Sequence, residues 1–180
     1  RAYGLEVLLR KNTGKLTGWI AYTLSKSEMQ TKGRTPEEIG INYGDWYSAP
    51  YDKPHDLSIT ATYEASPKWT FGAVFNLQSG LPTNYPVGRY SYLGKTLPVY
   101  SKRNEYRLPT YHRLDLSATY TPERTNKRWK GEWVFGVYNV YNRKNAVSVS
   151  FRENEDTKRN EAVKLSIFGI IPSVTYNFSF

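Results

Sequence analysis

Apolar and other residues alternate along about seven segments of the chain, which is the pattern of strands with one apolar face. The segments form three hairpins followed by one last strand that runs to the end of the sequence. Within each segment the apolar residues share one parity, so they lie on one face of the expected sheet. The expected strands cover approximately residues 3–10, 16–24, 57–63, 69–77, 114–120, 133–141 and 168–180.

The connections between these strands alternate in length. Short turns follow the first, third and fifth strands, and long loops follow the second, fourth and sixth. This alternation is typical of outer-membrane β-barrels, in which the short turns face the periplasm and the long loops face the cell exterior. In that orientation the C-terminus is periplasmic. The short turns follow Lys11, Ala65 and Thr121, and the long loops cover approximately Glu28–Lys53, Gly80–Pro109 and Glu153–Glu161.

The face opposite the apolar residues carries mostly small hydroxyl and amide groups. Such groups suit a crowded, wet lumen against a plug, whereas the outer face of a soluble sandwich would be charged. The apolar face is too large for a soluble surface, and lipid would cover it. A soluble two-layer sandwich that buries this face is the alternative. The opposite face holds Ser58, Thr60, Thr62, Thr70, Gly72, Asn76, Gln78, Arg113, Asp115, Ser117, Thr119, Ser173, Thr175, Asn177 and Ser179.

Composition narrows the class of protein further. There is no cysteine, which excludes disulfides and thiolate metal sites. The longest nearly apolar stretch, Ile167–Val174, is far shorter than the roughly 20 residues that a spanning helix needs. Sixteen Tyr, seven Phe and five Trp provide the residues for aromatic girdles at both bilayer interfaces.

The chain is basic, with 25 Lys and Arg against 16 Asp and Glu and a net charge of +9. Such a balance indicates nucleic acid, anionic lipid or lipopolysaccharide as a partner. The charges are spread over strand ends and connections rather than along one face. This distribution favours membrane headgroups over nucleic acid.

An odd number of about seven strands does not close a bacterial barrel. The sequence also starts at Arg1 without Met or an export signal. We therefore expect residues 1–180 to be a piece of a larger barrel, with further strands before Arg1. An eight-stranded small barrel would need another strand from Tyr90 onward, which Gly94, Pro98 and Pro109 oppose.

Several segments resemble the late strands of TonB-dependent outer-membrane receptors, in particular those of Bacteroidota-type bacteria, and the resemblance covers essentially the whole chain. It implies an all-β, antiparallel transmembrane barrel of about 22 strands, of which this chain is the C-terminal part. It also implies a plug domain in the lumen, before Arg1. The segments that carry it are Gly18–Ser25, Tyr51–Leu57, Tyr111–Ser117, Tyr138–Asn142 and Pro172–Phe180.

The function that the resemblance implies is the import of a scarce nutrient, with energy supplied through TonB. The nutrient is a siderophore, cobalamin, an oligosaccharide or a peptide, and the sequence does not say which. Expected partners are outer-membrane lipid and lipopolysaccharide, the rest of the barrel and plug, the TonB complex through segments absent here, and no nucleic acid. The alternatives are a small passive or structural barrel and a soluble β-sandwich binding module.

The aromatic last strand resembles the signal that the barrel-assembly machinery reads. This resemblance implicates Tyr176, Phe178 and Phe180. The same residues would also form the lower aromatic girdle.

No catalytic, phosphate-binding or dinucleotide motif is present, so neither enzyme activity nor a cofactor is expected. The long loops are the best candidates for ligand contact, because they combine aromatic rings and cations. We expect Trp46, Tyr90 and Arg103 to contact substrate. Residues of this kind could instead form the upper girdle and hold lipopolysaccharide phosphates.

Two features raise the question of a metal site. His55 and His112 start two strands of the same direction and could meet at the outer rim. The acidic run Glu153–Asp156 could hold a divalent cation, but Arg152, Lys158 and Arg159 oppose it. We expect no metal: interfacial histidines and a solvated hairpin tip explain both features.

Overall fold

The computed structural model describes residues 1–122, 130–153 and 160–179, and it is built of antiparallel strands with one 3₁₀ turn. No helix in these ranges is long and apolar enough to cross a membrane. The elements are β1 (Ala2–Lys11), β2 (Leu16–Met29), η1 (Ile41–Gly44), β3 (Tyr47–Ser48), β4 (His55–Ser66), β5 (Trp69–Gln78), β6 (Pro82–Thr83), β7 (Pro86–Tyr92), β8 (Lys95–Tyr100), β9 (Tyr106–Arg107), β10 (Tyr111–Tyr120), β11 (Lys130–Tyr138), β12 (Ser148–Glu153), β13 (Asn160–Leu165) and β14 (Ile171–Ser179).

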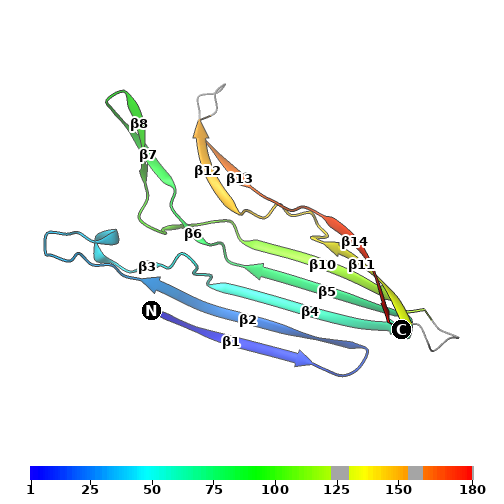
Figure 1. Ribbon diagram of the computed structural model, residues 1–180. Helices are drawn as coiled ribbons and strands as arrows, with labels where there is room; N and C mark the ends of the chain where they lie inside the picture. The colour runs from blue at the N-terminus through cyan, green and yellow to red at the C-terminus, as the bar shows by residue number, and fades with distance from the viewer. Residues whose placement is uncertain (123–129, 154–159, 180) are drawn as a thin grey trace.

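The main sheet has the order β1-β2-β4-β5-β10-β11-β14, with β3 added beside β2 (Figure 1). Its seven long strands are those that the alternation predicts, and each pairs with its neighbour as expected, so the antiparallel all-β fold is confirmed. Strand β11 ends at Tyr138, before the expected end at Tyr141. Residues 139–142 form a turn instead, in which Asn139 and Asn142 adopt positive φ.

The sheet is a single layer without a hydrophobic core of its own (Figure 1). Among the described residues the buried hydrophobic side chains are Tyr47 and Ala49, which lie near the end of the sheet rather than along it. The accessible surface is 13286 Å², against about 9,000 Å² for a globular monomer of this mass. No second layer in the described part covers either face.

One face of the sheet is apolar across all seven long strands. The register brings the apolar parity of each strand opposite that of the next, so the predicted stripes join into one surface. Leu9 and Val174, near its two edges, are each 62% exposed. Facing pairs on this side are Leu9–Ile20, Ile20–Ile59, Ile59–Phe75, Phe75–Leu114, Ala118–Phe135 and Phe135–Val174.

An aromatic row borders the apolar face at the end with the short turns. Trp69, Tyr120, Trp133 and Tyr176 face one another on consecutive strands from β5 to β14. The ring centroids of Trp69 and Tyr120 lie 4.8 Å apart, and those of Trp133 and Tyr176 lie 4.7 Å apart. We call these four residues the turn-end aromatic row.

The opposite face is polar, and small residues on its neighbouring strands face one another. Gly72 faces Ser117, and Gly136 faces both Ser117 and Ser173. A Cβ on Gly72 would lie 2.4 Å from Ser117 Oγ, and one on Gly136 would lie 2.6 Å from Ser173 Oγ. A larger side chain at either position would therefore require the neighbouring serine hydroxyl to move.

The long connections after β2 and β5 lie at one end of the sheet with the β12–β13 strands, and the turns after β1 and β4 lie at the other end with the end of β14 (Figure 1). Two of the long connections contain hairpins of their own. Strands β7 and β8 form a two-stranded hairpin despite Gly94 and Pro98, because Gly94 adopts positive φ in the turn and the hairpin is separate from the main sheet, where Pro98 would interrupt a ladder. Strands β12 and β13 form a second such hairpin.

A substitution at Gly18 tests whether β2 and β4 approach each other closely at this position. Its φ is +149°, and a Cβ there would lie 2.1 Å from the Thr60 carbonyl oxygen. We expect Gly18→Ala to lower the free energy of unfolding by about 2–3 kcal/mol, measured by chemical denaturation followed by circular dichroism. Gly14→Asn is the control, since Gly14 has positive φ in open space. Equal losses in the two variants would contradict the close approach.

Candidate functional site

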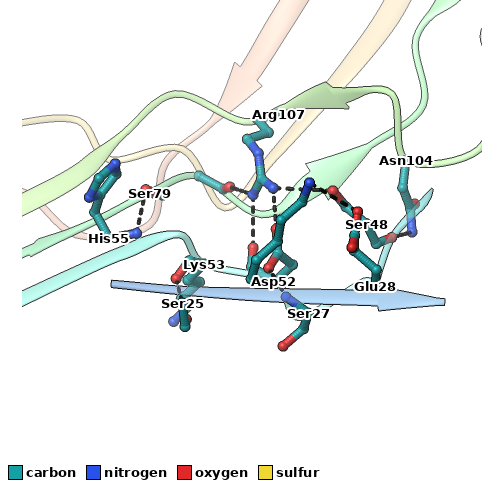
Figure 2. A network of polar contacts seen from close by, with 12 residues as sticks. Ser25, Ser27, Glu28, Ser48, Asp52, Lys53, His55, Ser79, Asn104 and Arg107 are labelled. Atoms are coloured by element: carbon teal, nitrogen blue, oxygen red, sulfur yellow. Dashed lines mark hydrogen bonds and ion pairs between the residues drawn. The ribbon is translucent and has the colours of Figure 1, made fainter. Parts of the chain in front are cut away.

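The long loops are joined at the end of the sheet by the ion pair between Arg107 and Asp52. Arg107 lies in β9 and Asp52 precedes β4, so the pair connects two different loops (Figure 2). The guanidinium also donates to the carbonyl oxygens of Asp52, at 2.8 Å, and Gly80, at 3.1 Å. Its third partner is the Ser48 hydroxyl at 3.3 Å.

Asp52 is 1% exposed, so its carboxylate is shielded from water and its hydrogen bonds come from these contacts. Besides Arg107, the Ser27 backbone N–H donates to it at 2.6 Å (Figure 2). A buried carboxylate without partners would carry a large desolvation cost. The cluster therefore fixes both loops to the end of β2. Lys53 extends it by donating to Gln78, which donates to Asp56.

A hollow of about 290 Å³ lies beside this cluster. Two of the three predicted ligand residues, Trp46 and Arg103, line it together. The structure thus brings together residues from two loops that lie far apart in the sequence. The other lining residues are Lys26, Glu28, Asn42, Tyr47, Ser48, Lys102, Asn104 and Glu105. We call this the loop-end hollow.

Trp46 and Glu28 line the hollow, and Arg1, which lies outside the lining, contacts both of them. The Arg1 guanidinium carbon lies 4.0 Å from the centroid of the Trp46 ring, a cation–π contact. Arg1 Nε donates to Glu28 at 2.8 Å, and Lys26 lies 3.0 Å from the other carboxylate oxygen. Glu28 lies at the end of β2, beyond the residues that pair with β4.

The turn that carries Lys102 and Arg103 also lines the hollow. The Arg103 backbone is held by Asn42, whose side chain accepts from Arg103 N at 2.8 Å and donates to Arg103 O at 3.0 Å. Lys102 Nζ lies 5.8 Å from the Tyr43 ring centroid. Within the described residues neither Lys102 nor Arg103 forms an ion pair. Both charges are therefore available to a ligand.

Tyr90 lies elsewhere. It is in β7, paired with Leu97 of β8, and is 53% exposed. It does not line the loop-end hollow. Tyr90 is therefore not brought together with Trp46 and Arg103, and its contact with substrate stays a prediction.

The two histidines lie on separate strands with β5 between them, and each pairs with a tyrosine. His55 Nδ1 is 2.8 Å from the Tyr22 hydroxyl, and His112 Nδ1 is 2.8 Å from the Tyr141 hydroxyl. Both pairs border the apolar face at the end of the sheet where the long loops lie. The turn-end aromatic row borders the same face at the other end. In the described ranges no group of three His, Asp or Glu is placed to hold a metal ion. The acidic run Glu153–Asp156 falls mostly outside the described residues.

A second polar anchor holds the turn after β11. Asn139, 1% exposed, exchanges two 3.0 Å hydrogen bonds with the Arg143 backbone, and its own N–H donates to Asp115. Asn145 also exchanges two hydrogen bonds with a backbone: its side chain accepts from His112 N at 3.2 Å and donates to His112 O at 2.9 Å. These bonds tie the turn to β10. The sequence signal for this anchor is the Asn-rich segment itself, since Asn tolerates positive φ and caps turns.

The last strand places Tyr176 and Phe178 on the apolar face, with their ring centroids 6.2 Å apart. Phe180 lies outside the described residues. The role of these three residues as an assembly signal stays a prediction.

Sequence reasoning missed Asp52 as the centre of the loop cluster. Its sequence signal is weak: one acidic residue between Tyr51 and Lys53, in a loop with several other charges. Only the contact with Arg107, 55 residues later, distinguishes it.

Arg107→Met tests the role of the cluster. Removing the guanidinium leaves the Asp52 carboxylate buried with one N–H donor, so we expect local opening of both loops to become easier by about 2 kcal/mol. Hydrogen exchange of the Asp52 and Leu108 amides, both bonded in loops, reports this opening. Arg34→Met is the control, because the Arg34–Glu38 pair is exposed. Unchanged exchange in Arg107→Met would contradict the role of the cluster.

Comparison of the chain with protein-family models, with curated proteins and with solved structures finds no match.

Proposed function

We propose that this chain is the C-terminal part of the wall of a transmembrane β-barrel in the outer membrane, and that the barrel is a TonB-dependent transporter. The observation that carries the proposal is the continuous apolar face, which no described residue covers. Lipid covers such a face without the aggregation that water would cause. The small polar residues of the other face then line the lumen.

The dimensions of the sheet agree with this proposal. Its seven long strands contain between 9 and 14 residues, and a tilted transmembrane strand needs about 9–11. The turn-end aromatic row and the Tyr22–His55 and Tyr141–His112 pairs border the apolar face at opposite ends. Amphipathic rings prefer these two levels of a bilayer.

The direction of the wall follows from its connections. Short turns belong to the periplasmic side of outer-membrane barrels, and long loops to the exterior. The loop-end hollow and the Asp52–Arg107 cluster then lie at the cell surface, and the last strand ends in the periplasm. In this orientation Tyr176 and Phe178 are accessible to the barrel-assembly machinery.

The open sheet supports a large barrel, and the small residues of its polar face support a plug of the kind that an active transporter has. Strands β1 and β14 are both edges of the described sheet, and the proposal gives each a neighbouring strand in a large barrel. Small residues on the polar face, such as Gly72, Gly136 and Ser117, leave space in the lumen for a plug. The cargo is a siderophore, cobalamin, an oligosaccharide or a peptide.

A soluble β-sandwich is the second candidate function. It requires a second apolar sheet to cover the first one. Three small two-stranded sheets accompany the main sheet. β7–β8 and β12–β13 project from the loop end instead of covering the apolar face, and β6–β9 lies within the loops at that end (Figure 1). The described residues therefore give the sandwich no second layer.

Fractionation of the cell envelope tests the proposal. We expect the whole protein to sediment with the outer membrane and to require detergent for extraction. Cells without the protein should lose energy-dependent uptake of one of the candidate nutrients, and collapse of the proton-motive force in normal cells should abolish the same uptake. Recovery in the soluble fraction would refute the membrane location, and uptake that persists without the proton-motive force would indicate a passive pore.

Two neighbouring residues of β14 test which face meets lipid. Val174 lies on the apolar face and Thr175 on the polar face, and both are exposed. We expect Val174→Arg to destabilise the protein folded in lipid by about 2–4 kcal/mol. We expect Thr175→Arg to destabilise it by less than about 1 kcal/mol. Refolding into vesicles at a series of urea concentrations measures both. Equal costs would contradict the assignment of the faces.

A further inference from the structure

The loop-end hollow lies on the apolar side of the sheet, not on the polar side. Tyr3 faces Lys26 on neighbouring strands, and Leu5 faces Leu24, so Lys26 shares the side of the apolar residues. Glu28 is two residues further along the same strand, and its 3.0 Å contact with Lys26 confirms the shared side. The hollow therefore continues the apolar face beyond the Tyr22–His55 pair.

The hollow has an excess of positive charge. Its lining contributes three cations, Lys26, Lys102 and Arg103, against the carboxylates of Glu28 and Glu105. Glu28 is already contacted by Lys26 and by Arg1, which lies outside the lining. Glu105 accepts from the Lys102 backbone N–H at 3.1 Å. The side-chain charges of Lys102 and Arg103 are left without a carboxylate partner in the described residues.

We propose that the loop-end hollow binds the phosphate group of an anionic lipid whose acyl chains cover the apolar face. This inference rests on the proposed membrane location. It assigns Trp46 and Arg103 to a lipid headgroup instead of to the transported substrate. Lys102 and Arg103 supply the donors for the phosphate, and Trp46 lies at the level of the headgroup.

The position of the hollow favours lipid over substrate as the source of the phosphate. A substrate in the lumen would meet the polar face, where Asn76 and Ser117 lie. The hollow lies on the other side of the wall, above the apolar residues, where the headgroup of a lipid packed against Leu5 and Leu24 would be found. Tryptophan at this level is typical of the interface, since its ring has an apolar body and a polar edge.

The donors also suit phosphate. The guanidinium of Arg103 can donate two parallel hydrogen bonds to phosphate oxygens, and the ammonium of Lys102 adds a mobile charge. The reciprocal bonds with Asn42 fix the backbone of the Arg103 turn, so little conformational entropy is lost when a ligand binds. The neighbouring Glu28 carboxylate is held by its own cations and does not compete.

The test is binding of lipid A to the whole protein in detergent, measured by native mass spectrometry. We expect bis-phosphorylated lipid A to bind and dephosphorylated lipid A to bind at least about tenfold more weakly. The double variant Lys102→Gln/Arg103→Gln should lose this difference. Lys95→Gln/Lys164→Gln, which removes two exposed cations outside the hollow, should keep it. Both double variants change the net charge equally.

Each further result has a definite meaning. Equal binding of the two lipids to the normal protein, or a normal phosphate preference in Lys102→Gln/Arg103→Gln, would overturn the inference. So would full competition by inorganic phosphate at the concentration of the lipid, which would indicate a simple anion site. These outcomes leave the membrane location intact, because that location is tested separately by envelope fractionation. If Lys102→Gln/Arg103→Gln lost nutrient uptake but bound both lipids as the normal protein does, Trp46 and Arg103 would be assigned to contact with the transported substrate instead.

Discussion

The continuous register of the seven long strands is the constraint on which the rest of the structure depends. The apolar residues of each strand face those of the next strand, from Leu9 in β1 to Val174 in β14, so most large apolar side chains of the sheet gather on one side. A slip of one residue in any ladder would move a whole strand's apolar set to the polar face. The single layer then needs cover from outside the described chain, and this need leads to the membrane proposal.

The loop end follows a different principle. The loops have almost no apolar core, since Tyr47 and Ala49 are the buried hydrophobic residues of the described part, so polar contacts determine their positions. The buried Asp52 carboxylate organises these contacts, because Arg107 and the Ser27 N–H both converge on it. A surface fixed in this way can hold charged residues such as Lys102 and Arg103 in place beside a hollow.

The strand positions and their pairing could be predicted from the sequence, because period-two alternation reports a half-exposed strand directly. The errors fall where this signal is weak. Strand β11 ends early because Asn139 adopts positive φ and bonds to Arg143, and β8 forms despite Pro98 because its hairpin is separate from the main sheet. Of the candidate ligand residues, Trp46 and Arg103 meet in one hollow, whereas Tyr90 lies on another hairpin.

The sequence by itself determined the all-β class, the seven long strands and the chemical difference between the two faces, because each depends on neighbouring residues along one strand. Only the tertiary structure decided which distant loops meet and on which side of the wall. The Asp52–Arg107 pair and the loop-end hollow join residues more than 50 positions apart. Such contacts depend on how complete loops fold back over the end of the sheet, and no local pattern encodes them.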